Sequence, residues 1–165
     1  MSASRMYVLS FNMEEPMCIY YGHLKTWIEK KHIKIGETDD WSPRLREYIN
    51  NYGCGSIKHH KNSPKCDGCG HVCNEVDKHS HHHVIVEKTW KVSFGKSKRT
   101  WIEDQIRGNF KKLPGRTRDY FYKEDLSIII EKMDELIKNM NNQIKSATIK
   151  KARMKTKNVS YYRLI

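Results

Sequence analysis

The pattern of apolar and polar positions predicts strands and helices over most of the chain. The aromatic and β-branched run Met6–Met13 is typical of a strand, and Met17–His32 carries apolar side chains at helical spacing. The segment DDWSPRLREYINNYG predicts a second helix, with Ser42 as its N-cap, Pro43 at its first position and Gly53 at its end.

The same pattern continues in the second half. Cys54–His60 predicts a short strand and His81–Trp90 a strong one, whereas Lys98–Leu113 is helical in pattern and Arg118–Leu126 opens or crosses a further helix. Side chains alternate along a strand. One face of the strong strand would therefore carry His81, His83, Ile85 and Glu87, and the other His82, Val84 and Val86.

From Glu124 onward the pattern predicts one long helix. Its apolar positions form a heptad stripe: Leu126, Ile130, Met133, Ile137, Met140 and Ile144. The ordinary interpretation is a helix packed on its own domain, and self-association through the stripe is the alternative. Beyond Ile144 the chain is basic, and it is either a solvated tail or an arm that binds a polyanion.

This order of elements predicts an α+β domain in which an antiparallel sheet carries helices. We expect one compact domain over residues 1–125, with a Cys/His-rich insertion at 61–79, and a C-terminal helix with a basic tail over residues 126–165. No apolar run approaches the length of a membrane span, and the first ten residues lack the apolar segment of a signal peptide.

The charge balance points to the kind of partner. Lys and Arg number 31 against 19 Asp and Glu, which gives a net charge of +12. An excess of this size favours a polyanionic partner, most often nucleic acid, with an anionic membrane surface as the lesser option. The alternative is a generally basic protein that has no polyanionic partner.

The insertion contains a candidate zinc knuckle. Three of the five cysteines, Cys66, Cys69 and Cys73, stand close together in CDGCGHVC, which favours metal ligation in a reducing compartment over a disulfide framework. Structural zinc takes four sulfur or nitrogen ligands, so a fourth is needed. The candidates are His59, which we prefer, His71, His79 and Cys54. Free thiols in a loop are the alternative.

Two further pairs of side chains could take part in metal binding or catalysis. His81 and His83 would lie on one side of a strand, close enough to share a divalent ion, although a surface histidine cluster is the alternative. Tyr120 and Lys123, at i and i+3, would share a helical face. A tyrosine can attack phosphorus and form a covalent phosphotyrosine if a metal polarises the phosphate and a cation offsets charge.

A basic connection precedes this tyrosine. We expect its cations to contact DNA: Lys111, Lys112, Arg116 and Arg118.

The segments YVLSFN, HHHVIVE and DYFYKED occur in the order found in the HUH rolling-circle or rolling-hairpin replication initiators, the Rep nuclease domains of small single-stranded DNA viruses and plasmids. The run HHHVIVEKTWKVSFGKSKRTWIEDQIR most resembles the parvovirus-type branch, and the resemblance covers roughly residues 5–125. His82 departs from the apolar residue usual in the middle slot. The zinc-knuckle-like insertion is not a general feature of the family.

The resemblance implies an antiparallel sheet of about five strands flanked by helices. It also implies a Mg²⁺- or Mn²⁺-dependent nick in single-stranded or hairpin DNA at an origin or terminus, with the tyrosine left on the 5′ phosphate. His81 and His83 would be the metal ligands, Tyr120 the nucleophile with Tyr122 as the fallback, and Lys123 the assisting cation. Such a protein would work in the host nucleus or another intracellular reducing compartment.

The family usually supplies a third metal ligand near the histidine strand. Here Glu75 and His60 are equal candidates. A site with three histidines would shift the preference from Mg²⁺ toward Mn²⁺, Co²⁺ or Zn²⁺, because imidazole is the softer ligand.

Two other functions remain open at this stage. One is a single-tyrosine HUH transposase, which would need a dimer with the tyrosine helix donated in trans. The other is a non-catalytic, zinc-stabilised nucleic-acid-binding module.

Overall fold

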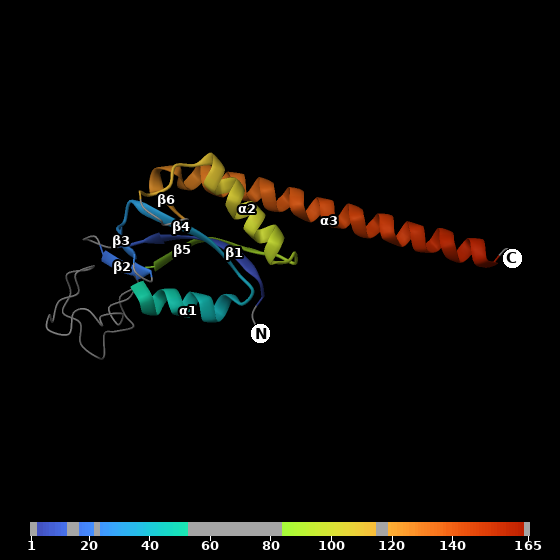
Figure 1. Cartoon of the computed structure of the whole chain (residues 1–165), viewed down its shortest axis with the longest axis horizontal. Coiled ribbons are helices and arrows are strands. Elements are labelled where there is room, and N and C mark those ends of the chain that lie inside the picture. Colours follow the sequence, from blue (N-terminus) through green and yellow to red (C-terminus); the bar gives the residue numbers. More distant parts are fainter. Residues whose placement is uncertain (1–2, 13–16, 22–23, 53–83, 115–118, 164–165) are drawn as a thin grey trace.

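The computed structural model describes residues 3–12, 17–21, 24–52, 84–114 and 119–163 (Figure 1). These residues form an α+β fold with an antiparallel four-stranded sheet in the order β5–β1–β4–β6. The strands of this sheet are β1 (Arg5–Phe11), β4 (His32–Thr38), β5 (Val84–Lys91) and β6 (Tyr120–Tyr122). The helices are α1 (Trp41–Tyr52), α2 (Lys96–Asn109), the short 3-10 helix η3 (Lys123–Asp125) and α3 (Leu126–Arg163), and β2 (Met17–Tyr21) and β3 (Leu24–Ile28) pair with each other.

Helices α2 and α3 cover one face of the sheet and α1 covers the other (Figure 1). Alternate side chains of β1 belong to the hydrophobic clusters on the two faces of the sheet. Met6 and Val8 belong to the hydrophobic cluster on the α2/α3 face, and Tyr7, Leu9 and Phe11 belong to the cluster on the α1 face. Because β1 is buried on both sides, it is apolar at nearly every position, as strands covered on both faces usually are.

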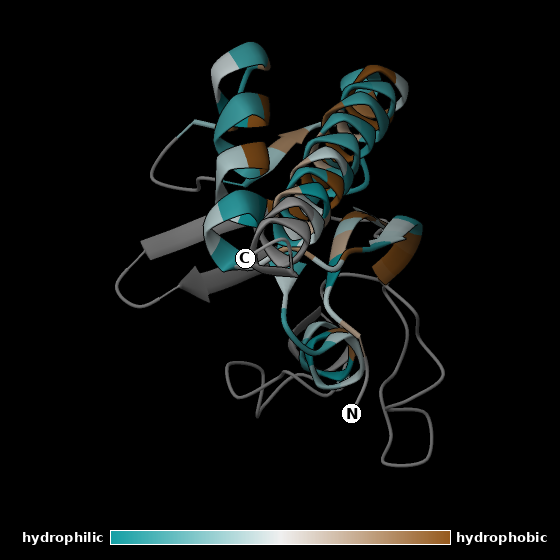
Figure 2. Cartoon of the chain, turned by 90° about the vertical axis from the view of Figure 1, so that its right-hand side faces the viewer, coloured by the Kyte–Doolittle hydropathy of each residue, from teal (hydrophilic) through white to brown (hydrophobic). Residues whose placement is uncertain are grey.

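The first half of α3 packs on the domain, as the heptad stripe predicts. Met133, Ile137 and Met140 are buried in the cluster on the α2/α3 face, and the other stripe residues are half-buried against it. In Figure 2 the helix that ends at the C-terminus carries both hydrophobic and hydrophilic positions, as expected for a helix with one face on a core. Self-association through the stripe stays an untested alternative.

The helix predicted over Met17–His32 is wrong. The structure has the hairpin β2–β3 there, in which Tyr21 pairs with Leu24, and then β4, which the sequence reasoning missed. The aromatic and β-branched residues of these two segments favour strands over a helix.

The predicted strands at β1 and β5 and the predicted helices at α1, α2 and α3 agree with the structure except at their ends. Helix α1 begins at Trp41, so Ser42 and Pro43 lie within its first turn and Ser42 is not the N-cap. The sheet has four strands among the described residues, not five. The strand predicted at Cys54–His60, the insertion at 61–79 and Gly53 lie outside the described residues. No helix in the described part of the chain is long and apolar enough to cross a membrane.

Candidate functional site

Strand β6 carries the predicted nucleophile, and it lies at one edge of the sheet. It pairs with β4 so that Tyr120 is opposite Lys34 and Tyr122 is opposite His32. The prediction that Tyr120 lies on a helix is therefore wrong, since the α-helix starts only at Leu126. Three successive aromatic residues fit a pleated edge strand better than a helical turn.

Tyr120 and Lys123 consequently do not share a helical face. Tyr120 is only 5% exposed, whereas Lys123 lies exposed in η3. Side chains two positions apart on a strand point to the same side, so the residue that shares a face with Tyr120 is Tyr122. Both belong to or pack against the hydrophobic cluster on the α1 face.

The cation beside Tyr120 is Lys34. Its Nζ lies 4.6 Å from the centroid of the Tyr120 ring, and the Phe11 ring stacks on the same tyrosine at 6.4 Å between centroids. The Lys34 side chain is 10% exposed, and its Nζ lies 3.9 Å from Asp119 Oδ2. Burial lowers the pKa of Lys34, and the nearby Asp119 carboxylate acts in the opposite direction. A buried amine of this kind can serve as a nearby cation or as a proton acceptor.

Sequence reasoning missed Lys34. The only local feature that marks it is its position between two isoleucines at the start of β4, in the stretch HIKI. The functional meaning of that lysine comes from its neighbours on β1, β6 and the residue before β6, which are remote in sequence.

Two more phenols line the α1 face. The hydroxyls of Tyr7 and Tyr48 are hydrogen-bonded at 2.7 Å, and the Tyr7 ring lies 4.9 Å from that of Trp41. Burial raises the pKa of both tyrosines, so these phenols stay protonated at neutral pH.

Tyr122 lies in a more open and more basic setting than Tyr120. The His32 ring meets it edge-on at 5.9 Å, and Lys111 Nζ lies 5.6 Å from its ring centroid. The backbone N–H of Lys123 donates to the carbonyl of Lys31 at 2.7 Å, which joins the end of β6 to the turn before β4. We call the exposed lysines around this strand the basic edge: Lys31, Lys111, Lys112 and Lys123.

His32 is buried beneath this edge. Its Nδ1 accepts a hydrogen bond of 3.2 Å from the backbone N–H of Glu29, so Nδ1 carries no proton. Burial lowers the pKa of His32, with Glu29 acting in the opposite direction. The exposed lysines and the half-buried Tyr122 ring thus lie together at this edge, and the buried, neutral His32 ring packs against Tyr122.

The start of β5 approaches the tyrosine strand through β1. Val84 pairs with Phe11, and it packs against the cluster that contains Tyr120. Ile85 pairs with Ser10, whose hydroxyl donates to Glu87 at 2.5 Å on the opposite face. The predicted alternation is thus confirmed for residues 84–87, after which the register with β1 shifts, and Val84 shares the face of Tyr120.

Most of the remaining predicted site residues lie outside the described part of the chain. They are His59, His60, Cys66, Cys69, Cys73, Glu75, His81, His83, Arg116 and Arg118. Among the residues that are described, no group of three His, Cys, Asp or Glu side chains could hold a metal ion.

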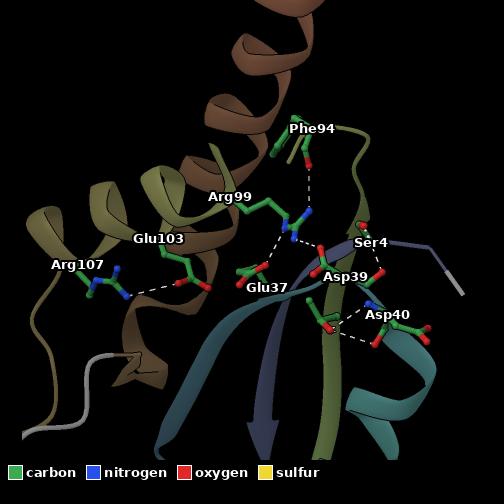
Figure 3. Close-up of polar contacts among 9 residues, drawn as sticks. Ser4, Glu37, Asp39, Asp40, Phe94, Arg99, Glu103 and Arg107 are labelled. Carbon is green, nitrogen blue, oxygen red and sulfur yellow. Dashed lines mark hydrogen bonds and ion pairs between the residues drawn. The ribbon is translucent and has the colours of Figure 1, made fainter. Parts of the chain in front are cut away.

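An ionic network occupies the α2/α3 face (Figure 3). Arg99, fully buried on α2, donates to Glu37 at 2.7 Å, to the carbonyl of Phe94 at 3.0 Å and also to Asp39. One turn further along α2, Glu103 lies 3.5 Å from Arg107. This network holds α2 against β4, and we assign it a structural role.

Comparison of the chain with protein-family models, with curated proteins and with solved structures found no match. We therefore infer function from residues, geometry and charge.

Proposed function

We propose that the chain is a metal-dependent nickase of the HUH type that acts on single-stranded DNA to initiate replication. The observation that supports this best is the convergence at Phe11. Val84, the residue that directly follows the histidine run, pairs with Phe11, and the ring of Tyr120 stacks on the same side chain. Val84 and Tyr120, which are 36 positions apart in sequence, thus approach each other through one aromatic ring.

In the proposed reaction a tyrosine oxygen attacks the phosphorus of a phosphodiester. The new bond is a phosphotyrosine on the 5′ phosphate, the bond from phosphorus to the 3′ oxygen breaks, and the phenolic proton ends on the released 3′ hydroxyl. A bound Mg²⁺ or Mn²⁺ ion would polarise the phosphate. Since the described residues hold no ligand cluster, its ligands would come from His81, His83 and either Glu75 or His60.

Tyr120 is our first choice for the nucleophile, and Lys34 replaces Lys123 as the cation nearest to it. Because Tyr120 is buried, DNA can reach the Tyr120 hydroxyl only if the α1 face opens locally. Tyr122, beside the basic edge, is accessible without such a change, and the two tyrosines need separate tests.

A covalent adduct is the decisive observable. The chain is incubated with Mn²⁺ and a pool of single-stranded and hairpin oligonucleotides labelled at the 3′ end, because the 3′ fragment carries the 5′ phosphate that stays on the protein. We expect a labelled protein band on a denaturing gel that disappears in Tyr120→Phe. Tyr48→Phe, which removes another hydroxyl from the same face, is the matched control and should keep the band.

The histidines are tested in the same assay. Val84 shares the face of Tyr120, and on the predicted alternation His82 has the parity of Val84. The resemblance assigns the metal to His81 and His83, so we expect His81→Ala/His83→Ala to abolish the adduct and His82→Ala to keep it. The reverse result would assign the metal ligand to His82, the histidine with the parity of Val84. Metal-independent cleavage that survives both Tyr120→Phe and Tyr122→Phe would show that the proposed mechanism is wrong.

The burial of Tyr120 favours one second candidate, a nucleic-acid-binding module without catalysis. The basic edge would then bind DNA, and no adduct would form. This function predicts that Lys111→Gln/Lys112→Gln weakens binding of single-stranded DNA while Tyr120→Phe changes no measurable property. Zinc content before and after Cys66→Ser/Cys69→Ser tests the predicted knuckle separately, and unchanged zinc would remove it.

A further inference from the structure

The distal part of α3 is a helix with solvent on every side. Each residue from 145 to 156 is exposed, whereas Ile144, the last residue of the heptad stripe, is half-buried against the domain. Figure 1 shows this part of α3 running away from the rest of the molecule. Helices in proteins gain most of their stability from packing an apolar face, and this segment packs none.

The charge on this segment has one sign. The chain contains no Asp or Glu after Glu135, and the exposed residues 145–156 include five cations: Lys145, Lys150, Lys151, Arg153 and Lys155. Lys151 and Lys155 are four positions apart and Lys150 and Arg153 are three apart, so like charges face one another on successive turns. Such pairs destabilise a helix unless an external anion neutralises them.

The apolar residues of the segment do not suit a helical partner or a bilayer. The next two positions of the heptad stripe are Ala147 and Lys151, so the stripe ends where α3 leaves the domain. The exposed apolar side chains, Ile149 and Met154, are five positions apart, which places them about 140° apart around the helix axis. A coiled coil or a membrane-surface helix needs a continuous apolar face, and this segment has none.

A cationic cylinder of this kind fits a groove walled by phosphates. A helix is about 10–12 Å in diameter with its side chains, and the major groove of B-form DNA is about 12 Å wide. We propose that residues 145–156 form an arm that binds the phosphate backbone of duplex DNA. This binding site is separate from the tyrosine strand and does not depend on the nicking reaction.

The test measures binding of the full chain to a fluorescent, blunt-ended duplex by anisotropy, in EDTA so that no nicking can contribute. The arm variant is Lys150→Gln/Lys151→Gln/Arg153→Gln/Lys155→Gln. The matched control removes four exposed positive charges from the domain: Lys91→Gln/Lys96→Gln/Lys98→Gln/Lys138→Gln. Each lost phosphate contact lowers the salt dependence of log Kd by about 0.9.

We expect the arm variant to bind the duplex at least about tenfold more weakly, with a salt slope shallower by up to about 3.6. We expect the control to change both quantities by less than half as much. Addition of duplex should also raise the helical circular-dichroism signal of the unmodified chain, because the anion relieves repulsion between like charges.

Three results would overturn the proposal. The first is an equal loss of duplex binding in both variants, which shows only a bulk charge effect. The second is no loss of duplex binding in either variant. The third is arm-dependent binding to phosphatidylserine-containing vesicles that is tighter than binding to the duplex. The covalent adduct on single-stranded DNA is measured for both variants in parallel. Failure of the nicking proposal appears as no adduct from any chain, whereas failure of the arm proposal appears only in the duplex measurements.

Discussion

Glu103 gives the sharpest test of the electrostatics of the fold. Its carboxyl is buried on α2, and burial raises its pKa to about 7. The nearby Asp119 and Glu37 carboxylates add to this rise, and Arg107 and Lys34 oppose it. The folded protein therefore keeps the Glu103 proton over a pH range in which the unfolded chain has already lost it.

The size of the effect follows from the shift. The pKa of Glu103 rises from 4.5 to about 7, and at about 1.36 kcal/mol for each pKa unit the penalty is about 3 kcal/mol. Between these two values the folded state binds more protons than the unfolded state. The contribution of Glu103 to the free energy of unfolding therefore falls as the pH rises through this window, and it stays low above about pH 7.

Glu103→Gln removes the ionisation and keeps the shape of the side chain. We expect it to have the stability of the parent at the acid end of the window and to exceed it by up to about 3 kcal/mol at about pH 8. Urea denaturation in steps from about pH 5 to about pH 8 measures the difference. Glu131→Gln, at an exposed position of α3, controls for the loss of one negative charge. A difference that does not vary with pH, or a Glu103→Gln variant less stable at about pH 8, would refute the reasoning.

Three further predictions use the same denaturation assay. Arg99→Ala leaves the largely buried Glu37 carboxylate without its cation and should lower the free energy of unfolding by about 3–5 kcal/mol; a loss below about 1 kcal/mol would contradict a buried pair. Gly36→Ala places a Cβ 2.3 Å from the ring of Tyr7 and should destabilise by about 1–3 kcal/mol, whereas an unchanged midpoint would mean that the ring moves freely. Ile129→Ala should cost about 2–5 kcal/mol because its side chain is fully buried, and its exposed neighbour Ile128→Ala should cost under about 1; equal losses would count against the described packing of α3.

The parts of the fold that local pattern could predict are those in which pattern and propensity agree. The strand at β1, the helices α1 and α2 and the stripe of α3 are of this kind. The hairpin β2–β3 is not, because Ile19, Leu24 and Trp27 happen to fit helical spacing although Ile19 and Trp27 are of types that favour strands. Greater weight on the strand propensity of the aromatic and β-branched residues would have found it.

The candidate site was harder to predict for a different reason. Strand β6 has three residues, and its conformation depends on pairing with β4, which lies more than eighty positions earlier. A pattern over three residues cannot separate a strand from the first turn of a helix. The sequence therefore indicated Tyr120 and Tyr122 as chemical candidates, but it paired Tyr120 with Lys123, when the lysine beside its ring is Lys34.

The division of the sheet into two faces determines how the functional assays should be interpreted. Phe121, between the two tyrosines, is fully buried in the cluster on the α2/α3 face, while Tyr120 and Tyr122 belong to the α1 face. Replacement of a tyrosine by phenylalanine removes only a hydroxyl from the α1 face and leaves the packing of α2 and α3 intact. Loss of the DNA adduct at unchanged stability would therefore report on chemistry. Loss of the adduct together with stability, as expected for Arg99→Ala, would report only that the sheet no longer brings β5 and β6 together across β1.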